Sequence, residues 1–215
     1  FGDAGGIVCS LQSSVTIDRC RVVSNYGTLG GGIGFIGSRL TIISSAISNN
    51  VGEGLGGGIY CNGDTASQVL IDSCTFSGNS CLPGPGAIAY SQGASLTVRN
   101  TIITGNTSAN TSGIDVHTSA RSAIIENCTI TNGISTSGSI NGAAVYGANQ
   151  EATIRLTDTT ISNNQGFGIR TLSNTTLTNC RIERNEFSGV FCQGGDIELR
   201  QCMVSLNHSH NSIDR

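Results

Sequence analysis

The chain has 215 residues, of which 30 are glycine and 9 are cysteine, and its formal net charge is −3. This weak negative charge and the absence of lysine argue against a nucleic-acid-binding surface. No apolar run approaches the roughly 18 residues of a membrane-spanning helix, so no direct membrane span is expected.

Eight segments of eleven residues repeat along the chain and align without gaps. In each segment the third and eighth positions are apolar, and the sixth is Cys, Ser or Thr. The eleventh is Asn in seven segments and Gly133 in the other. The segments are 15–25, 40–50, 69–79, 96–106, 123–133, 154–164, 175–185 and 197–207.

A glycine followed by a short apolar run precedes each segment. The first and third residues after the glycine are mostly apolar and the residue between them varies, which predicts short strands with one buried face. The runs are 6–9, 32–35, 58–61, 86–89, 113–116, 142–145, 168–171 and 189–192. The variable, outward residues are then Val8, Gly34, Tyr60, Ile88, Asp115, Ala144, Arg170 and Phe191.

The spacing between these glycines is 21 to 29 residues. Two or three short strands per repeat, joined by Gly and Asn corners, predict an all-β, right-handed parallel β-helix of about eight coils, forming a single domain over residues 1–215. Equivalent side chains of successive coils then stack in columns about 4.8 Å apart.

The Asn column predicts a hydrogen-bonded ladder at one corner of the coil. Stacked Asn amides bond to one another and to the backbone, and Asn tolerates the left-handed conformation of a sharp bend. Gly133 interrupts the ladder, which predicts a local weak point. The ladder residues are Asn25, Asn50, Asn79, Asn106, Asn164, Asn185 and Asn207.

One set of charged residues fits either a solvated surface or a catalytic site. Asp72, Arg99 and Glu126 occupy the fourth position of three successive segments and therefore lie on neighbouring coils. They form either an alternating charge ladder of little energetic weight or the acid–base groups of an enzyme acting on uronic sugars.

The stretch 54–61, GLGGGIYC, does not predict a phosphate-binding loop. Such a loop requires a following helix and usually a Lys, whereas Ile59 begins a strand. In the first five coils the next glycine run begins seven to nine positions after the corner residue, and the loops between them predict a ridge along one side. The binding residues expected on this ridge and at its base are Tyr26, Leu55, Tyr60 and Leu82.

The cysteines favour mostly free, buried thiols, because most of them fall in inward columns. Cys180 and Cys202 occupy the same column in adjacent coils, so they are close enough to form a disulfide. Cys81 falls in a predicted loop outside the columns, and it is a candidate for bridging to another chain or loop.

Two further residue types have limited predictive value. Among five glycosylation sequons, about as many as chance gives, Asn110 and Asn174 are the loop sites that could carry glycan. His208 and His210 lie two apart without an evident third ligand, so no metal and no cofactor is expected.

The run Gly57-Gly58-Ile59, followed by Phe76 and Asn79, resembles the repeats of the polymorphic outer-membrane proteins of chlamydiae. Those repeats pair a Gly-Gly-aliphatic motif with Phe-x-x-Asn. One coil matches in full, and the other seven keep Ile or Val in place of Phe. The resemblance implies a surface-exposed, non-enzymatic adhesin on a β-helix of the pectin-lyase-like kind.

Together these features predict an extracellular or cell-surface protein with a structural or adhesive role, such as a fibre or filament subunit. Its expected partners are copies of itself or further coils of the same protein stacked end to end, and a host-cell or carbohydrate surface. The alternative function is a carbohydrate-active β-helix enzyme, a polysaccharide lyase or hydrolase.

Overall fold

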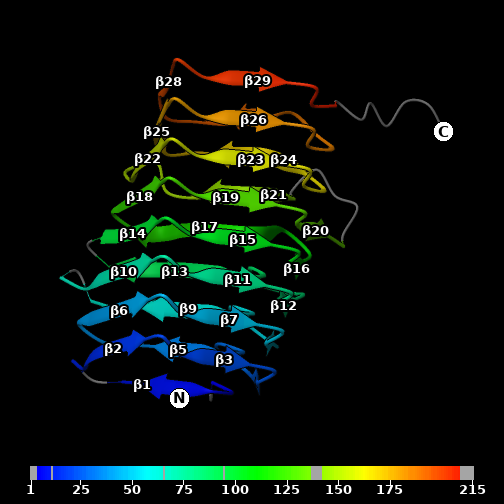
Figure 1. The fold of residues 1–215 in the computed structure, drawn as a ribbon. Coiled ribbons are helices and arrows are strands. Elements are labelled where there is room, and N and C mark those ends of the chain that lie inside the picture. Colours follow the sequence, from blue (N-terminus) through cyan, green and yellow to red (C-terminus); the bar gives the residue numbers. More distant parts are fainter. Residues whose placement is uncertain (1–3, 11, 65, 94, 137–141, 209–215) are drawn as a thin grey trace.

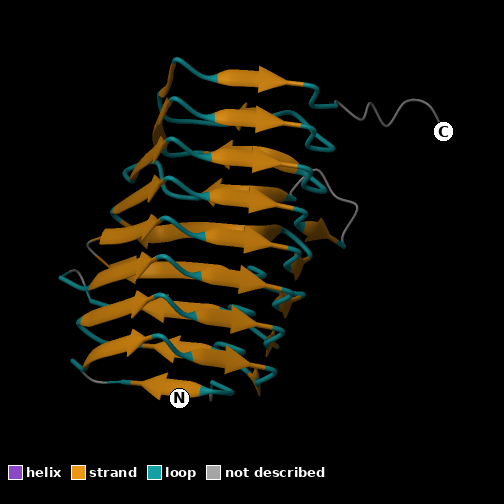
Figure 2. Cartoon of the chain, viewed as in Figure 1, coloured by secondary structure: helices purple, strands orange, loops and turns teal. Residues whose placement is uncertain are grey.

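The computed structural model describes residues 4–10, 12–64, 66–93, 95–136 and 142–208. These residues form strands and connecting loops that stack as successive turns of a rod, with residues 4–10 and 197–208 at opposite ends of the stack (Figures 1 and 2). They include no helix long and apolar enough to cross a bilayer.

Four parallel sheets, here called A to D, run along the rod, and each turn contributes one strand to each of the first three. Sheet A has eight strands. They are β1 (Ile7–Cys9), β5 (Ile33–Phe35), β9 (Ile59–Asn62), β13 (Ile88–Gly93), β17 (Thr111–Ala120), β21 (Ala143–Gly147), β24 (Phe167–Thr171) and β27 (Val190–Cys192).

Sheet B follows sheet A in every turn. Its strands are β2 (Ser14–Asp18), β6 (Arg39–Ile43), β10 (Gln68–Asp72), β14 (Ser95–Arg99), β18 (Ser122–Glu126), β22 (Thr153–Thr157), β25 (Asn174–Thr178) and β28 (Ile197–Arg200). Sheet C contains β3 (Arg21–Val23), β7 (Ala46–Ser48), β11 (Thr75–Ser77), β15 (Ile102–Thr104), β19 (Thr129–Thr131), β23 (Thr160–Ser162), β26 (Arg181–Glu183) and β29 (Met203–Ser205).

Sheet D corrects the expectation that only loops follow the Asn corners of the first five turns. Two residues after each of these corners pair in parallel with the next turn before the loop departs. The five strands are β4 (Tyr26–Gly27), β8 (Val51–Gly52), β12 (Ser80–Cys81), β16 (Thr107–Ser108) and β20 (Ile134–Ser135).

The predicted apolar columns form the bore. The third and eighth positions of the first seven segments are at most 6% exposed, from Ile17 and Val22 through Leu177 and Ile182. In the last described turn the equivalent Leu199 and Val204 are 44% and 45% exposed, because no described turn covers them. Burial of these stacked aliphatic side chains is the main favourable term in the stability of the fold.

The predicted Asn ladder is present. The Oδ1 of Asn79 accepts hydrogen bonds from the backbone N and the Nδ2 of Asn50, at 3.0 and 2.9 Å. Each of the described ladder amides from Asn50 on also donates to a carbonyl of the turn before, as Asn79 does to Ile47 O at 2.8 Å. The ladder therefore ties side chain to backbone at every step where Asn is present.

The sequence predicted that the ladder Asn itself adopts the left-handed conformation at this corner. Instead, the residue before the ladder Asn does so. Asn49 and Asn132, for example, have φ values of 54° and 56°, and Gly78 has 63°. The ladder Asn keeps a negative φ and aims its amide into the rod. A second row of left-handed residues separates sheets B and C, among them Asn100 and Asn127 with φ of 52° and 48°.

Two of the outward positions were predicted wrongly, because the alignment was anchored on glycine. Strand pairing places Ile88 beside Ile59 and Ala89 beside Tyr60, so Ile88 points into the bore and is fully buried. Val145 pairs with Ile114, and Ala144 is likewise buried. The outward residues of these turns are therefore Ala89 and Tyr146.

Candidate functional site

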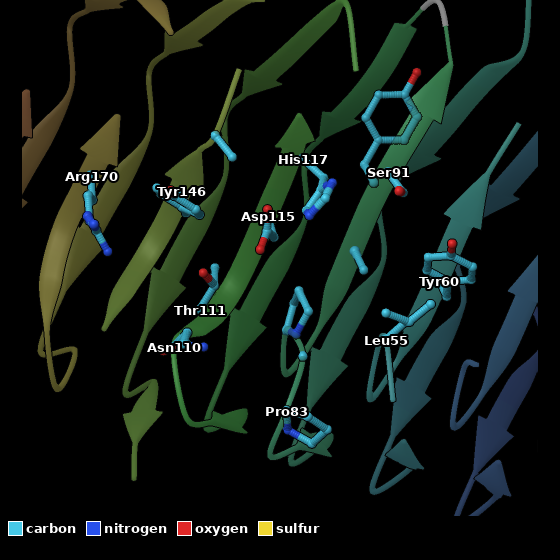
Figure 3. Close-up of a pocket in the computed structure, with 15 residues that line it drawn as sticks. Leu55, Tyr60, Pro83, Ser91, Asn110, Thr111, Asp115, His117, Tyr146 and Arg170 are labelled. Carbon is cyan, nitrogen blue, oxygen red and sulfur yellow. The ribbon is translucent and has the colours of Figure 1, made fainter. Parts of the chain in front are cut away.

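A groove of about 510 Å³ lies on the outer face of sheet A. Its floor carries one outward side chain from each of five neighbouring strands, which strand pairing places in register. At about 4.8 Å per turn the floor extends about 19 Å along the rod. In chain order these residues are Tyr60, Ala89, Asp115, Tyr146 and Arg170 (Figure 3).

The loops that leave sheet D form one side of the groove. Leu55, Pro83, Pro85 and Asn110 line it from three successive turns, and Figure 3 shows Leu55, Pro83 and Asn110 beside the strand ends that carry the floor. Proline fixes its own φ and gives this loop a limited set of conformations. The groove is thus framed by a rigid sheet and by a loop with restricted backbone.

Asp115 lies at the middle of the floor, on the ten-residue strand β17. Burial raises the pKa of its carboxyl from 3.8 to about 7. Its Oδ1 is buried and has no hydrogen-bond partner among the described residues. Such a carboxyl is poised to bind a ligand or to exchange a proton near neutral pH.

Tyr146 and Arg170 continue the floor on the next two strands. The Arg170 guanidinium carbon lies 5.1 Å from the centre of the Tyr146 ring, within the range of a cation–π contact. The Nε of Arg170 also donates to the Oε1 of Gln193 at 2.7 Å. These contacts hold the arginine in place at the end of the groove.

The four predicted binding residues separate into two pairs. Leu55 and Tyr60 line the groove, whereas Tyr26 and Leu82, 62% and 58% exposed, lie outside its lining. Tyr60 does point to the outer face, but neighbouring turns leave it only 7% exposed. Tyr26 donates its hydroxyl to the Glu53 carboxylate on the turn above.

The charged trio of sheet B is a surface feature. Asp72 accepts from Arg99 Nε at 2.8 Å and from Asn100 Nδ2 at 2.8 Å, and the bonds from Asn100 and Arg99 hold the pKa of Asp72 below its ordinary value. Glu126 pairs in register with Arg99 and is exposed. None of the three lines the groove, and the alternative interpretation of Asp72, Arg99 and Glu126 as acid–base groups of an enzyme stays a prediction.

The thiols of all nine cysteines are free. Cys180 and Cys202 stack in adjacent turns as predicted, and the nearby Cys202 side chain contributes, after burial, to raising the pKa of Cys180 to about 11. The expectation for Cys81 is wrong: it ends β12, is 1% exposed, and burial raises the pKa of its thiol. A buried Cys81 is not presented to another chain.

The two glycosylation candidates differ in position. Asn110 is exposed and lines the groove, whereas the Oδ1 of Asn174 accepts a bond from the backbone N of Asp196 at 2.9 Å. His210 lies outside the described residues, and His208 is exposed. Within the described ranges, no group of three or more His, Cys, Asp and Glu side chains is arranged to hold a metal ion.

The groove-lining residues Thr111, Asp115 and Tyr146 were not among the binding residues predicted from the sequence. When the repeats are aligned on the glycine before each apolar run, the outward residues of these turns are Tyr60, Ile88, Asp115, Ala144 and Arg170. This column is not continuously polar or aromatic, so it does not stand out as a binding surface. Aligning the inward aliphatic residues Ile59, Ile88, Ile114, Val145 and Ile169 instead brings Tyr146 between Asp115 and Arg170.

The stacked parallel sheets, the Asn ladder and the groove across successive turns define a parallel β-helix protein. The family model of the right-handed β-helix region matches residues 5–169 and 95–213, and the chain belongs to this family. The predicted fold, right-handedness included, is therefore confirmed. Comparison with curated proteins and with solved structures gave no match.

Proposed function

We propose that this chain is an extracellular or cell-surface β-helix with an adhesive role, which binds an extended carbohydrate chain along the groove of sheet A. The observation that carries the proposal is the groove itself. It combines aromatic residues, a partly buried carboxyl and an arginine on five strands in register. The spacing of the turns is close to the length of one pyranose residue, so successive sugars meet successive side chains.

The likeness of Gly57-Gly58-Ile59, Phe76 and Asn79 to the repeats of chlamydial polymorphic outer-membrane proteins supports the adhesive role. In those proteins the implied setting is the cell surface. By this likeness, the chain would also lie at the cell surface and bind a host-cell or carbohydrate surface.

The experiment places a large side chain in the groove and leaves the inward-facing core residues unchanged. Ala89 is 6% exposed at the floor, between Tyr60 and Asp115, so Ala89→Trp places an indole in the ligand's path. Thr97→Trp, on the outer face of sheet B, is the matched control. Binding is measured on an array of oligosaccharides, with circular dichroism to check folding. Loss of binding in Ala89→Trp alone supports the proposal, whereas equal binding by both variants contradicts it.

A second candidate function is a carbohydrate-active enzyme, and the Asp115 carboxyl favours it. With a pKa of about 7 it is present in both protonated and ionised forms at neutral pH, as general acid–base catalysis requires. Asp115 is the one carboxylate among the described groove-lining residues. A hydrolase of the two-carboxylate kind needs a second, so proton abstraction by a lyase is the form of catalysis that suits the groove better.

Incubation with polysaccharides separates the enzyme from the binding protein. Product formation by the wild type that is lost in Asp115→Asn, and retained in the sheet B variant Asp72→Asn, would establish the enzyme. Binding without new chain ends or unsaturated products would establish the adhesive role.

We also propose that the rod continues by stacking on further coils, from the same protein or from another copy. Leu199 and Val204, whose column equivalents are buried, present apolar surface at the last described turn, and open sheet ends pair readily with other strands. Val204→Asp introduces a charge there. Sedimentation and electron microscopy of the wild type and this variant test the idea, since equal populations of single rods at every concentration would contradict association between copies.

A further inference from the structure

We propose that Thr111 Oγ1 and Asp115 Oδ1 form the specificity-determining subsite of the groove, which takes two adjacent hydroxyl groups of an uncharged sugar residue. This inference rests on the proposed binding of carbohydrate in the sheet A groove. It adds the atoms that select the ligand and the charge that the ligand carries.

Both atoms belong to residues that line the groove, and neither has a hydrogen-bond partner among the described residues. Thr111 is 1% exposed, and its Oγ1 has no hydrogen-bond partner among the described residues. The Oδ1 of Asp115 is also buried and has no hydrogen-bond partner among the described residues. Buried polar side chains in native proteins are almost always hydrogen-bonded. Three groove-lining residues carry an unpartnered oxygen, and of these Tyr90 belongs to the hydrophobic core and pairs with Cys61. The oxygens of Thr111 and Asp115 therefore indicate a place where a ligand supplies the bonds.

The local backbone explains how both side chains reach the groove. Thr111 and Asp115 belong to β17, the longest strand of sheet A. They lie four residues apart, and residues at even spacing along a strand share a face; the pairing with β21 shifts register between Thr111 and Ile114. Figure 3 shows the two side chains on the same stretch of the groove floor.

The chemistry of the pair favours hydroxyl groups. A hydroxyl both donates and accepts, so it satisfies an ionised carboxylate, a protonated carboxyl and the threonine hydroxyl in turn. Two hydroxyls on neighbouring ring carbons supply one partner to each atom. Ala89, the smallest side chain of the floor, lies beside Asp115 in the preceding turn and leaves room for the ring that bears them.

The charges of the groove favour an uncharged sugar at this position. An acidic sugar would bring its carboxylate to Asp115, which disfavours binding whenever that carboxyl is ionised. The guanidinium of Arg170 lies two turns away, held on Tyr146 and by Gln193, so it does not neutralise an anion at Asp115. An acidic sugar therefore gains nothing here over a neutral one, and an amino sugar gains only while Asp115 is ionised.

The test uses three variants and a panel of oligosaccharides. Thr111→Val removes the hydroxyl and keeps the shape, Asp115→Asn replaces the carboxyl by an amide, and Thr111→Ser restores the hydroxyl as the rescue variant. The probes are neutral hexasaccharides of glucose, mannose and xylose, their monodeoxy analogues, polygalacturonate and chitosan. Affinity is measured by calorimetry, and folding by thermal unfolding.

We expect the wild type to bind a neutral hexasaccharide more tightly than polygalacturonate or chitosan. It should bind the deoxy analogue of that hexasaccharide at least about tenfold more weakly than the parent sugar. Thr111→Val and Asp115→Asn should weaken binding of the parent sugar by a similar factor and abolish the preference over the analogue, and Thr111→Ser should behave as wild type.

Three other outcomes overturn the inference. If Ala89→Trp abolishes binding while Thr111→Val and Asp115→Asn leave affinity and preference unchanged, the subsite is wrong and the proposed function stands. If polygalacturonate or chitosan binds in preference to every neutral sugar, the ligand class is wrong and the function again stands. If no oligosaccharide binds, both fail.

Discussion

Ser112 fills the space that the Asn ladder leaves at Gly133. A Cβ added at Gly133 would overlap the Ser112 hydroxyl and lie 2.7 Å from the Ser112 Cβ, while Ser112 itself is buried. The backbone N of Gly133 still donates to Asn164 Oδ1 at 2.9 Å. The ladder is interrupted there, as the sequence predicted, but a side chain from sheet A occupies the missing amide's place.

This pairing predicts strong coupling between the two positions. Gly133→Asn alone should destabilise the fold by about 1–3 kcal/mol, because its side chain collides with Ser112. In the background of Ser112→Gly the same change should cost at least about 1 kcal/mol less. Denaturant unfolding of the four proteins measures the coupling. Additive effects would mean that Ser112 does not determine the choice of glycine.

A second prediction concerns the intact part of the ladder. Asn79→Ala removes four side-chain hydrogen bonds, to Asn50, Ile47 and Asn106, from a fully buried site. At about 1 kcal/mol each the free energy of unfolding should fall by about 3–4 kcal/mol. Asn174→Ala is the control, since its exposed side chain accepts a bond from the backbone N of Asp196, and the loss of that bond should cost about 1 kcal/mol. Equal losses in the two variants would refute a structural role specific to the ladder.

The Asp115 carboxyl predicts a pH-dependent difference between wild type and Asp115→Asn. Because its pKa is raised from 3.8 in the unfolded chain to about 7 in the fold, the folded state binds the proton more tightly. Ionisation therefore destabilises the fold progressively as pH rises from about 4 to about 7, by at most about 4 kcal/mol.

Asp115→Asn should then match the wild type near pH 4 and exceed its unfolding temperature above pH 7. His117 on the same strand, Ala89 and Tyr90 on β13, Tyr146 on β21, and Tyr60 and Arg170 along the groove are common to both proteins, so the difference isolates the Asp115 carboxyl. Thermal unfolding at several pH values measures it, and parallel curves would show that the carboxyl keeps an ordinary pKa.

Thiol labelling of the native protein should divide the cysteines by burial. Cys20 and Cys192 are exposed and should react first. Cys61, Cys74, Cys81 and Cys128 are buried, and burial raises the pKa of each thiol, that of Cys128 to about 11. They should react only after unfolding, because the thiolate is the reactive form. Mass spectrometry assigns the sites, and fast labelling of Cys81 would contradict its place in β12.

Much of the fold can be predicted from the sequence because every turn must place apolar side chains in the bore and an amide at the corner, at equivalent positions. Ile17, Ile42 and Ile71 must all be apolar, and Asn50 and Asn79 must both present an amide, so the period is visible in a single chain. The outer face carries no such demand. The site was hidden because the glycine of one turn is replaced by Ala87 and that of another by Ala144, which shifts the apparent register by one and two residues.

The fourth sheet was missed for a related reason. Its strands are two residues long, such as Ser80–Cys81, and too short to show a period of two. Each of these strands directly follows the same corner position, which is Asn in four turns and Gly133 in the fifth. Neighbouring turns then bring these residues into register without help from their own side chains.

The floor of the groove takes one side chain from each turn, and that arrangement has a consequence for how such a surface diversifies. A substitution at Ala89 or Tyr146 alters one position of the ligand track and leaves the inward residues of the same strand untouched. Gain or loss of a whole turn lengthens or shortens the track by one unit without creating a new packing problem. Recognition of the proposed ligand along this rod would therefore be modular, so that specificity could change one sugar ring at a time while the scaffold stays the same.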